Sequence, residues 1–133
     1  MNYGSDFDID LKFGEAGEEK LKQILKDPKI EVKRDRWTYK TGNIAVEYWC
    51  RNKPSGISVS KANWWAFIIT ADNKDDIILL IESNALKKIC RKYYNMGRTK
   101  EMGDNNLSKS VLIPYKDIIR EIYLSDCLLT NKA

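Results

Sequence analysis

The chain has 133 residues, of which 43% are hydrophobic and 32% charged, and its formal net charge is +4. This balance fits one soluble globular domain over residues 1–133 and leaves too little chain for a second hydrophobic core. The longest apolar runs, 64–69 and 77–81, are too short to cross a bilayer, and the N-terminus lacks the layout of a signal peptide. We therefore expect a cytoplasmic protein without membrane association.

The residue types that the sequence lacks exclude several kinds of catalysis and metal binding. The sequence contains no histidine, which excludes Ser-His-Asp and Cys-His catalysis and zinc held by histidine. Its three cysteines, Cys50, Cys90 and Cys127, are widely spaced and form no Cys-x-x-Cys pair, so neither a structural zinc site nor a disulfide framework is expected. Any catalysis must use carboxylates, lysines, tyrosines or an oxygen-bound metal ion, and the mildly basic charge suits a polyanionic partner.

The N-terminal part of the chain predicts an arm followed by a helix. Residues 1–12 mix aspartates with apolar residues and indicate an arm or a short edge strand. Residues 14–26 show helical periodicity, in which Leu21, Ile24 and Leu25 form an apolar stripe and the glutamates lie in the first turns. The helix is expected to end before the next proline.

One carboxylate on this predicted helix is unusually placed. Glu18 precedes Leu21 by three residues and Leu25 by seven, so it lies on the apolar stripe, while Glu15 is one step further out and Glu19 is turned away. A carboxylate at that end of an apolar face either caps the helix or points into a site.

Two alternating segments follow, at 30–35 and 43–47, and both have the period-2 pattern of strands. If they pair as a hairpin, Asp35 and Glu47 come close together on one face with Lys33 beside them. Two carboxylates and an ammonium suit a Mg²⁺ ion and a phosphate oxygen, although solvated cross-strand ion pairs give the same pattern.

The rest of the chain predicts a short extended piece at 57–59, buried strands at 65–70 and 77–82, a helix at 84–94, a polar loop at 95–110, a strand at 111–114 and a helix at 115–124. The residues expected to face the core from the two helices are Leu86, Ile89, Cys90, Tyr93, Ile118, Ile119 and Ile122. The expected fold class is α/β, with a central mixed β-sheet flanked by helices.

The order of these elements and carboxylates resembles the restriction-endonuclease-like PD-(D/E)xK nuclease superfamily over roughly residues 14–95. The resemblance implies a core of a helix, a three-strand meander, a helix and a further strand. The family pattern has a glutamate on the first helix, an aspartate ending one strand and a Glu-x-Lys on the next. Glu18 matches the helix glutamate, with Glu15 in reserve, Asp35 matches the aspartate, and Glu47 matches the first residue of Glu-x-Lys.

The likeness is closest to small phage-type and junction-resolving members of this superfamily. It is carried by the segments Glu31-Val-Lys-x-Asp35, Gly42-Asn-x-x-x-Glu47 and Pro54-Ser-Gly56. A phage-encoded protein would work in the host cytoplasm. Because a small nuclease that cuts both strands usually works as a dimer, we also expect a homodimer.

The sequence departs from the family pattern in two ways. No proline precedes Asp35, and Trp49 stands where the lysine is expected. Lys33, on the same strand face as Asp35, could supply the ammonium instead. A competing register takes Glu31-x-Lys33 as the Glu-x-Lys, but only Asp27 in a turn is then left as the aspartate.

The resemblance implies a Mg²⁺- or Mn²⁺-dependent DNA endonuclease that hydrolyses phosphodiester bonds, with specificity for DNA structure. Asp35 and Glu47 would be direct metal ligands, and Glu18 would bind a second ion or a metal-bound water. Lys33 would orient the attacking water or stabilise the phosphorane.

Basic and aromatic residues around this wall are the candidates for DNA contact, because cations neutralise phosphates without reading sequence. They are Arg34, Arg36, Trp37, Lys40, Arg51, Lys53, Ser55 and Lys61. Trp37, among three cations, is the best candidate for stacking on a base. Two alternatives remain at this point: a catalytically inactive nucleic-acid-binding module on the same fold, and a protein-interaction domain whose charges are ordinary surface.

Overall fold

The computed structural model describes residues 3–27 and 29–122, with the backbone alone for residues 3–5. Both helices and strands occur along this part of the chain, in agreement with the α/β prediction. The helices are α1 (Tyr3–Lys26), α2 (Thr38–Thr41) and α3 (Ser83–Asn95). The strands are β1 (Ile30–Asp35), β2 (Asn43–Cys50), β3 (Lys53–Pro54), β4 (Trp64–Ala71), β5 (Lys74–Glu82), β6 (Thr99–Met102) and β7 (Ser108–Pro114).

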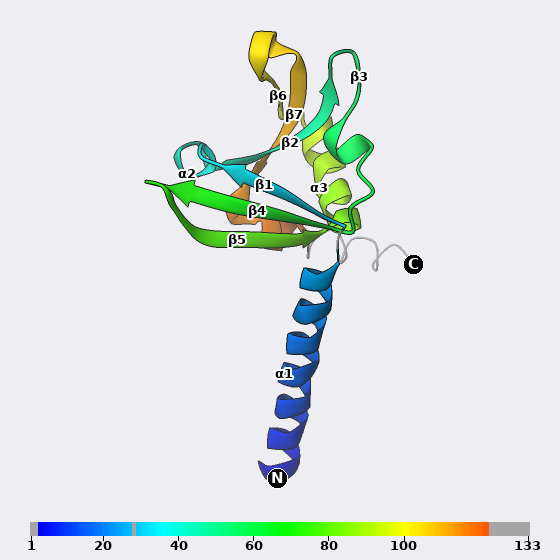
Figure 1. The fold of residues 1–133 in the computed structure, drawn as a ribbon, viewed down its shortest axis with the longest axis vertical. Helices are drawn as coiled ribbons and strands as arrows, with labels where there is room; N and C mark the ends of the chain where they lie inside the picture. The colour runs from blue at the N-terminus through cyan, green and yellow to red at the C-terminus, as the bar shows by residue number, and fades with distance from the viewer. Residues whose placement is uncertain (1–2, 28, 123–133) are drawn as a thin grey trace.

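The strands form two sheets instead of the single central sheet that the sequence predicted. The first is mixed, with the order β1-β4-β5, and the second is antiparallel, with the order β3-β2-β7-β6 (Figure 1). β4 takes the centre of the first sheet because it is almost entirely apolar, and Trp65 and Phe67 on it are 1% and 2% exposed.

The predicted hairpin between β1 and β2 is wrong. β1 runs parallel to β4, from Ile30 opposite Trp64 to Asp35 opposite Ile69, while β2 pairs with β3 and β7. The short helix α2 turns the chain from one sheet into the other. Alternation correctly indicated two strands, but alternation fixes the faces of a strand and not its partner.

The core lies between the two sheets and α3. Ile44 and Val46 of β2 meet Val111 and Ile113 of β7, and all four side chains are at most 2% exposed. α3 packs against β7 and buries the predicted residues Leu86, Ile89, Cys90 and Tyr93. Burial raises the pKa of the Cys90 thiol to about 12, so this cysteine behaves as a packed apolar side chain.

The start of α3 differs in one detail from the sequence pattern. The Glu82 carboxylate accepts a hydrogen bond from the Ala85 backbone N–H at 2.8 Å and so caps the helix, which begins at Ser83, one residue before the predicted start.

Three further segments differ from their predictions. The expected polar loop at 95–110 contains β6 and the first residues of β7, and the extended piece at 57–59 is a 3₁₀ turn at Gly56–Ser58. Residues 118–122 are helical, and of the three isoleucines predicted to face the core Ile118 is buried and Ile122 is partly buried against it, whereas Ile119 is 84% exposed. The end of the predicted helix lies outside the described residues.

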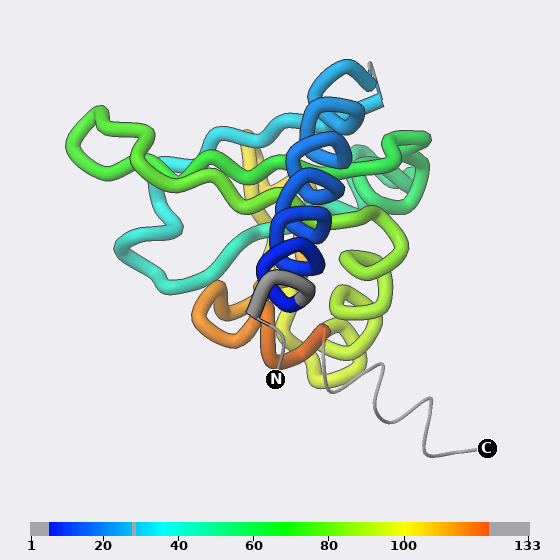
Figure 2. Tube along the Cα trace, turned by 90° about the horizontal axis from the view of Figure 1, so that it is seen from below, coloured from blue at the N-terminus to red at the C-terminus, as the bar shows by residue number. Residues whose placement is uncertain are grey.

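α1 is longer than predicted and projects from the two sheets (Figure 1). It begins at Tyr3, so residues 3–12 are helix and not an arm or an edge strand. Seen from below, α1 stands in front of the sheets (Figure 2), and its predicted core residues Leu21 and Leu25 are 49% and 65% exposed. No helix among the described residues is long and apolar enough to span a membrane.

The burial difference between two isoleucines predicts a difference in stability. Ile113→Ala should lower the free energy of unfolding by about 2–5 kcal/mol, because it leaves a cavity at a fully buried position. Ile119→Ala should change it by less than about 0.5 kcal/mol, because that side chain is exposed. Urea unfolding followed by tryptophan fluorescence measures both values, and equal losses would contradict this packing.

Candidate functional site

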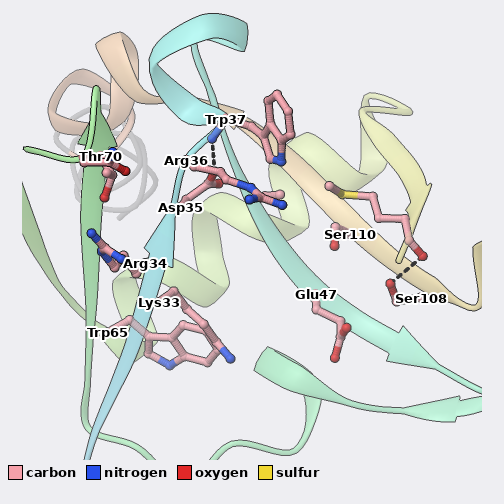
Figure 3. Close-up of a pocket in the computed structure, with 13 residues that line it drawn as sticks. Lys33, Arg34, Asp35, Arg36, Trp37, Glu47, Trp65, Thr70, Ser108 and Ser110 are labelled. Carbon is pink, nitrogen blue, oxygen red and sulfur yellow. Dashed lines mark hydrogen bonds between the residues drawn. The ribbon is translucent and has the colours of Figure 1, made fainter. Parts of the chain in front are cut away.

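A pocket of about 560 Å³ opens between the two sheets, at the carboxyl end of β1 (Figure 3). Charged and polar side chains from both sheets share it. Its lining residues are Lys33, Arg34, Asp35, Arg36, Trp37, Ala45, Glu47, Trp65, Thr70, Asn73, Met102, Ser108 and Ser110. The structure therefore brings Lys33, Asp35 and Glu47 to one pocket, although their strands do not pair with each other.

The charged face of β1 is turned toward this pocket. The Lys33 ammonium lies 5.9 Å from the ring centroid of buried Trp65 and 2.9 Å from the Glu31 carboxylate. Val32, on the opposite face of the strand, is 56% exposed. The arrangement holds an ammonium at the pocket through an ion pair and a cation–π contact.

Asp35 ends β1 and holds the start of α2. Its Oδ1 accepts a hydrogen bond from the backbone N–H of Trp37 at 2.6 Å (Figure 3) and a second one from the backbone N–H of Thr38 at 3.2 Å. Its Oδ2 has no hydrogen-bond partner among the described residues. One oxygen of this carboxylate thus orients the side chain, while the other is available to a ligand.

Glu47 is positioned by the Pro54-Ser-Gly segment. The Ser55 hydroxyl donates to Glu47 Oε2 at 3.0 Å, and the Ser55 backbone N–H donates to the Tyr48 carbonyl at 3.1 Å. Gly56 packs so closely that a Cβ there would lie 2.1 Å from the Glu47 carbonyl oxygen, and its φ is +53°. Only glycine fits this approach, so the segment resembling the nuclease motif fixes the backbone and carboxylate of Glu47.

A β-bulge explains the position of Trp49. Glu47 is opposite Ser110 but Trp49 is opposite Lys109, so β2 advances two residues where β7 advances one. Because paired residues share a face and neighbours alternate, Trp49 points to the opposite face from Glu47. The Lys109 ammonium lies 6.0 Å from the Trp49 ring centroid, in agreement with this orientation. A lysine at position 49 would not reach the pocket.

Cationic and aromatic side chains surround the opening. Arg36 and Lys40 each lie 5.4 Å from the ring centroid of Trp37, which is 51% exposed. Arg34 Nε donates to the Asp75 carboxylate at 3.0 Å. This hydrogen bond from Arg34, with a second one from Thr70, lowers the pKa of Asp75 below its ordinary value.

Several predicted site residues lie elsewhere. Glu18 and Glu15 are exposed on α1 and do not line the pocket. Lys61 lines a different depression, together with Lys29 and Glu31. Arg51 and Lys53 are exposed at the turn between β2 and β3.

Asp27, the aspartate of the competing register, makes hydrogen bonds that stabilise the turn before β1. It accepts hydrogen bonds from the Asn63 side-chain amide at 3.0 Å and the Lys29 backbone N–H at 2.8 Å, and these bonds lower its pKa. Asp27 is not part of the pocket that contains Lys33, which favours Asp35 and Glu47 as the carboxylates of the site.

Sequence reasoning missed the wall of the pocket that β6 and β7 provide. Ser108 and Ser110 are buried and line it, and the Ser108 hydroxyl donates to the Met102 carbonyl at 2.7 Å. The sequence pattern could have indicated this strand, because the two serines continue the alternation of the apolar strand that follows them. Because serine is polar, these positions were assigned to a loop instead.

The donor set fits Mg²⁺ or Mn²⁺ modestly. Among the described residues, no three His, Cys, Asp or Glu side chains converge on one point. Asp35 and Glu47 each keep one carboxylate oxygen without a hydrogen-bond partner in the described chain. Mg²⁺ is commonly held by one or two carboxylates, with water and substrate phosphate completing its shell, so Asp35 and Glu47 are the candidate ligands that line this pocket.

Comparison with known proteins finds no family model that matches this chain, and no significant match among curated proteins or solved structures. The assignment of the site therefore depends on the residues themselves.

The contact between Gly56 and Glu47 predicts an unequal response to alanine. Gly56→Ala should cost about 3 kcal/mol or more, because it adds a clash with the Glu47 carbonyl to a left-handed backbone. Gly42→Ala, with φ of +74° and nothing within 4 Å of its Cβ, should cost only about 1–2 kcal/mol. Denaturant titration of the two variants checks the difference, and equal costs would refute the clash.

The pair Arg34–Asp75 predicts a pH dependence. Because the folded-state pKa of Asp75 lies below its ordinary value of 3.8, the pair stabilises the fold above that pH and loses its contribution as pH falls through the folded pKa. Asp75→Asn should therefore unfold with a smaller decline in urea midpoint between about pH 5 and 3. Asp76→Asn, which removes a carboxylate without a described partner, should keep the wild-type slope.

Proposed function

We propose that this protein is a metal-dependent DNA endonuclease of the PD-(D/E)xK type, which hydrolyses phosphodiester bonds. The observation that carries the proposal is that Lys33, Asp35 and Glu47 all line one pocket, which two arginines also line. The histidine-free sequence leaves oxygen-bound metal chemistry as the route best suited to these side chains.

The order of elements supports a restriction-endonuclease-like core. A helix, α1, precedes the strands that carry Asp35 and Glu47, and α3 with a further strand follows. The pairing departs from a simple meander, since β1 joins β4 and β2 joins the second sheet. What matters for the chemistry is that the two carboxylates still line the same pocket.

Asp35 and Glu47 would hold the metal ion through their unpartnered oxygens. Bound Mg²⁺ or Mn²⁺ would polarise a phosphoryl oxygen and lower the pKa of a bound water. Each carboxylate is already oriented by hydrogen bonds, Asp35 by two backbone N–H groups and Glu47 by Ser55. Little side-chain entropy is therefore left to lose when a ligand binds.

Lys33 supplies the positive charge that the family pattern places on the Glu47 strand. Its ammonium is held between Glu31 and the Trp65 ring at the pocket wall. From there it can stabilise negative charge that develops on the phosphate oxygens. The bulge after Glu47 explains why this strand cannot provide the lysine.

DNA would be held mainly through its backbone. Arg34 and Arg36 line the pocket and can neutralise phosphates on either side of the reacting one. Trp37, half exposed and flanked by Arg36 and Lys40, offers an aromatic face for an unstacked base. A base available for stacking is found where the duplex is branched or single-stranded, which favours a structure-specific substrate.

The alternative is an inactive module that binds nucleic acid on the same fold. It is favoured by Trp49 in place of the expected lysine. Such a module would bind DNA in EDTA as well as the enzyme does, but it would neither cleave DNA nor need a metal ion.

We expect Mn²⁺-dependent cleavage when the protein is incubated with supercoiled, linear and branched DNA. Asp35→Asn and Glu47→Gln should each reduce the rate at least about 100-fold, because each removes a metal ligand. The asparagine keeps a side-chain oxygen for the N–H groups of Trp37 and Thr38, so the fold should survive. Mn²⁺ should also raise the melting temperature of the wild type and not of Glu47→Gln.

Two controls separate the registers and the alternatives. Lys33→Ala should be nearly inactive, whereas Asp27→Asn should cleave DNA normally, because Asp27 serves the turn before β1. Wild-type rates in Asp35→Asn or Glu47→Gln would refute the site. DNA binding with no cleavage and no metal-dependent rise in melting temperature would establish the inactive module.

A further inference from the structure

α1 presents an apolar surface that the rest of the described chain does not cover. Phe7, Leu11, Leu21 and Leu25 are between 49% and 65% exposed, and only Ile24 among the side chains from 6 to 26 is half-buried. Most helices in proteins are stabilised by packing of such a face, and α1 also contains three glycines that weaken it in isolation. This helix therefore needs a partner.

The direction in which α1 leaves the two sheets argues against α1 folding back onto the sheets of its own chain. Asp27 accepts hydrogen bonds from Asn63 and from the Lys29 backbone N–H, and the Asn63 N–H donates to the Lys29 carbonyl at 2.8 Å. The Lys20 ammonium also lies 5.8 Å from the Trp64 ring centroid. These contacts tie the end of α1 to the start of β4, and Figure 1 shows that α1 points away from the sheets.

The spacing of the apolar residues is that of a two-helix seam. Six positions follow one another at intervals of four and three residues, which is the heptad pattern of coiled coils. They are Phe7, Leu11, Gly14, Glu18, Leu21 and Leu25. Ile9 and Phe13 lie off this seam.

Charge is segregated along the same helix. Residues 6–19 carry six carboxylates, Asp6, Asp8, Asp10, Glu15, Glu18 and Glu19, against the single cation Lys12, whereas residues 20–26 carry Lys20, Lys22 and Lys26 and no carboxylate. The helix dipole accounts for charges in the first and last turns alone. Two such helices attract each other when they run antiparallel and repel each other when they run parallel.

We propose that α1 pairs with α1 of a second copy of this chain as an antiparallel two-helix coiled coil. The seam is then self-complementary, because each large residue meets another large one and the glutamate meets a glycine. The opposed pairs are Phe7 with Leu25, Leu11 with Leu21, and Gly14 with Glu18 of the other copy. Asp8 faces Lys22 of the other copy beside the seam. The sheets of the two copies lie at opposite ends of the helix pair.

Glu18 takes a defined place in this dimer. It occupies a seam position, where a carboxylate weakens pairing but sets the register, and the missing side chain of Gly14 leaves it room. This role explains why Glu18 lies on the apolar stripe and outside the pocket.

Sedimentation velocity on the full chain tests the pairing. The wild type should have twice the 15.5 kDa mass of the chain. The double variant Leu11→Asp, Leu21→Asp should be monomeric, while Ile9→Asp, the same kind of change off the seam, should remain dimeric. Glu18→Leu should tighten the dimer about tenfold or more, because it extends the apolar seam.

Cross-linking tests the direction of the helices, in a background with Cys50→Ser and Cys127→Ser. A mixture of Phe7→Cys and Leu25→Cys proteins should cross-link to each other, and Phe7→Cys alone should not. Self-cross-linking of Phe7→Cys would overturn the antiparallel pairing. A monomeric wild type, or a dimer that survives Leu11→Asp with Leu21→Asp while circular dichroism and fluorescence show a folded body, would overturn the α1 interface. None of these readouts depends on nuclease activity.

Discussion

Parallel pairing of β1 with β4 is the constraint on which the pocket depends. Because β1 runs alongside the central apolar strand, its carboxyl end, Asp35, reaches the rim of the first sheet. The chain must then turn through α2 before β2 can start, and β2 finds its partners in a second sheet. The pocket is the space between these sheets, so a β1–β2 hairpin would have removed the cavity while keeping the same residues.

Two residues near this cavity contain a buried polar atom without a hydrogen bond in the described part of the chain. Two buried polar atoms lack a hydrogen-bond partner among the described residues, the Trp65 indole N–H and the Thr38 hydroxyl. Trp65 lines the pocket, and Thr38 follows Trp37 at its rim. An unsatisfied buried group costs about 1–3 kcal/mol, so a hydrogen-bond partner for either atom would stabilise the folded chain.

The sequence predicted best where periodicity and burial agree. The helix that contains Leu86 and Tyr93 and the apolar strand β4 were recognised because their side chains pack as their patterns indicate. β5 was recognised as a strand, but the prediction that it is buried is wrong for Ile77 and Ile78, which are 51% and 61% exposed. β6 and the start of β7 were missed, because Ser108 and Ser110 have the composition of a loop although they are buried in a strand. The prediction of strand pairing failed for a different reason, since alternation carries no information about which strand is the partner.

The structure places part of the candidate site in one pocket, and the residue that lies outside it is informative. Asp35 and Glu47 share a pocket through contacts between sheets that no local pattern encodes, while Glu18 was assigned to the same site from its place on an apolar helix stripe. A short apolar stripe does not distinguish a helix that packs on its own body from one that packs on another copy. The distinction lies in the charges that flank it and in the joint at Asp27, which holds α1 away from the sheets. A carboxylate on such a stripe is therefore as well explained by register in a helix pair as by metal binding, and the direction of the helix decides between them.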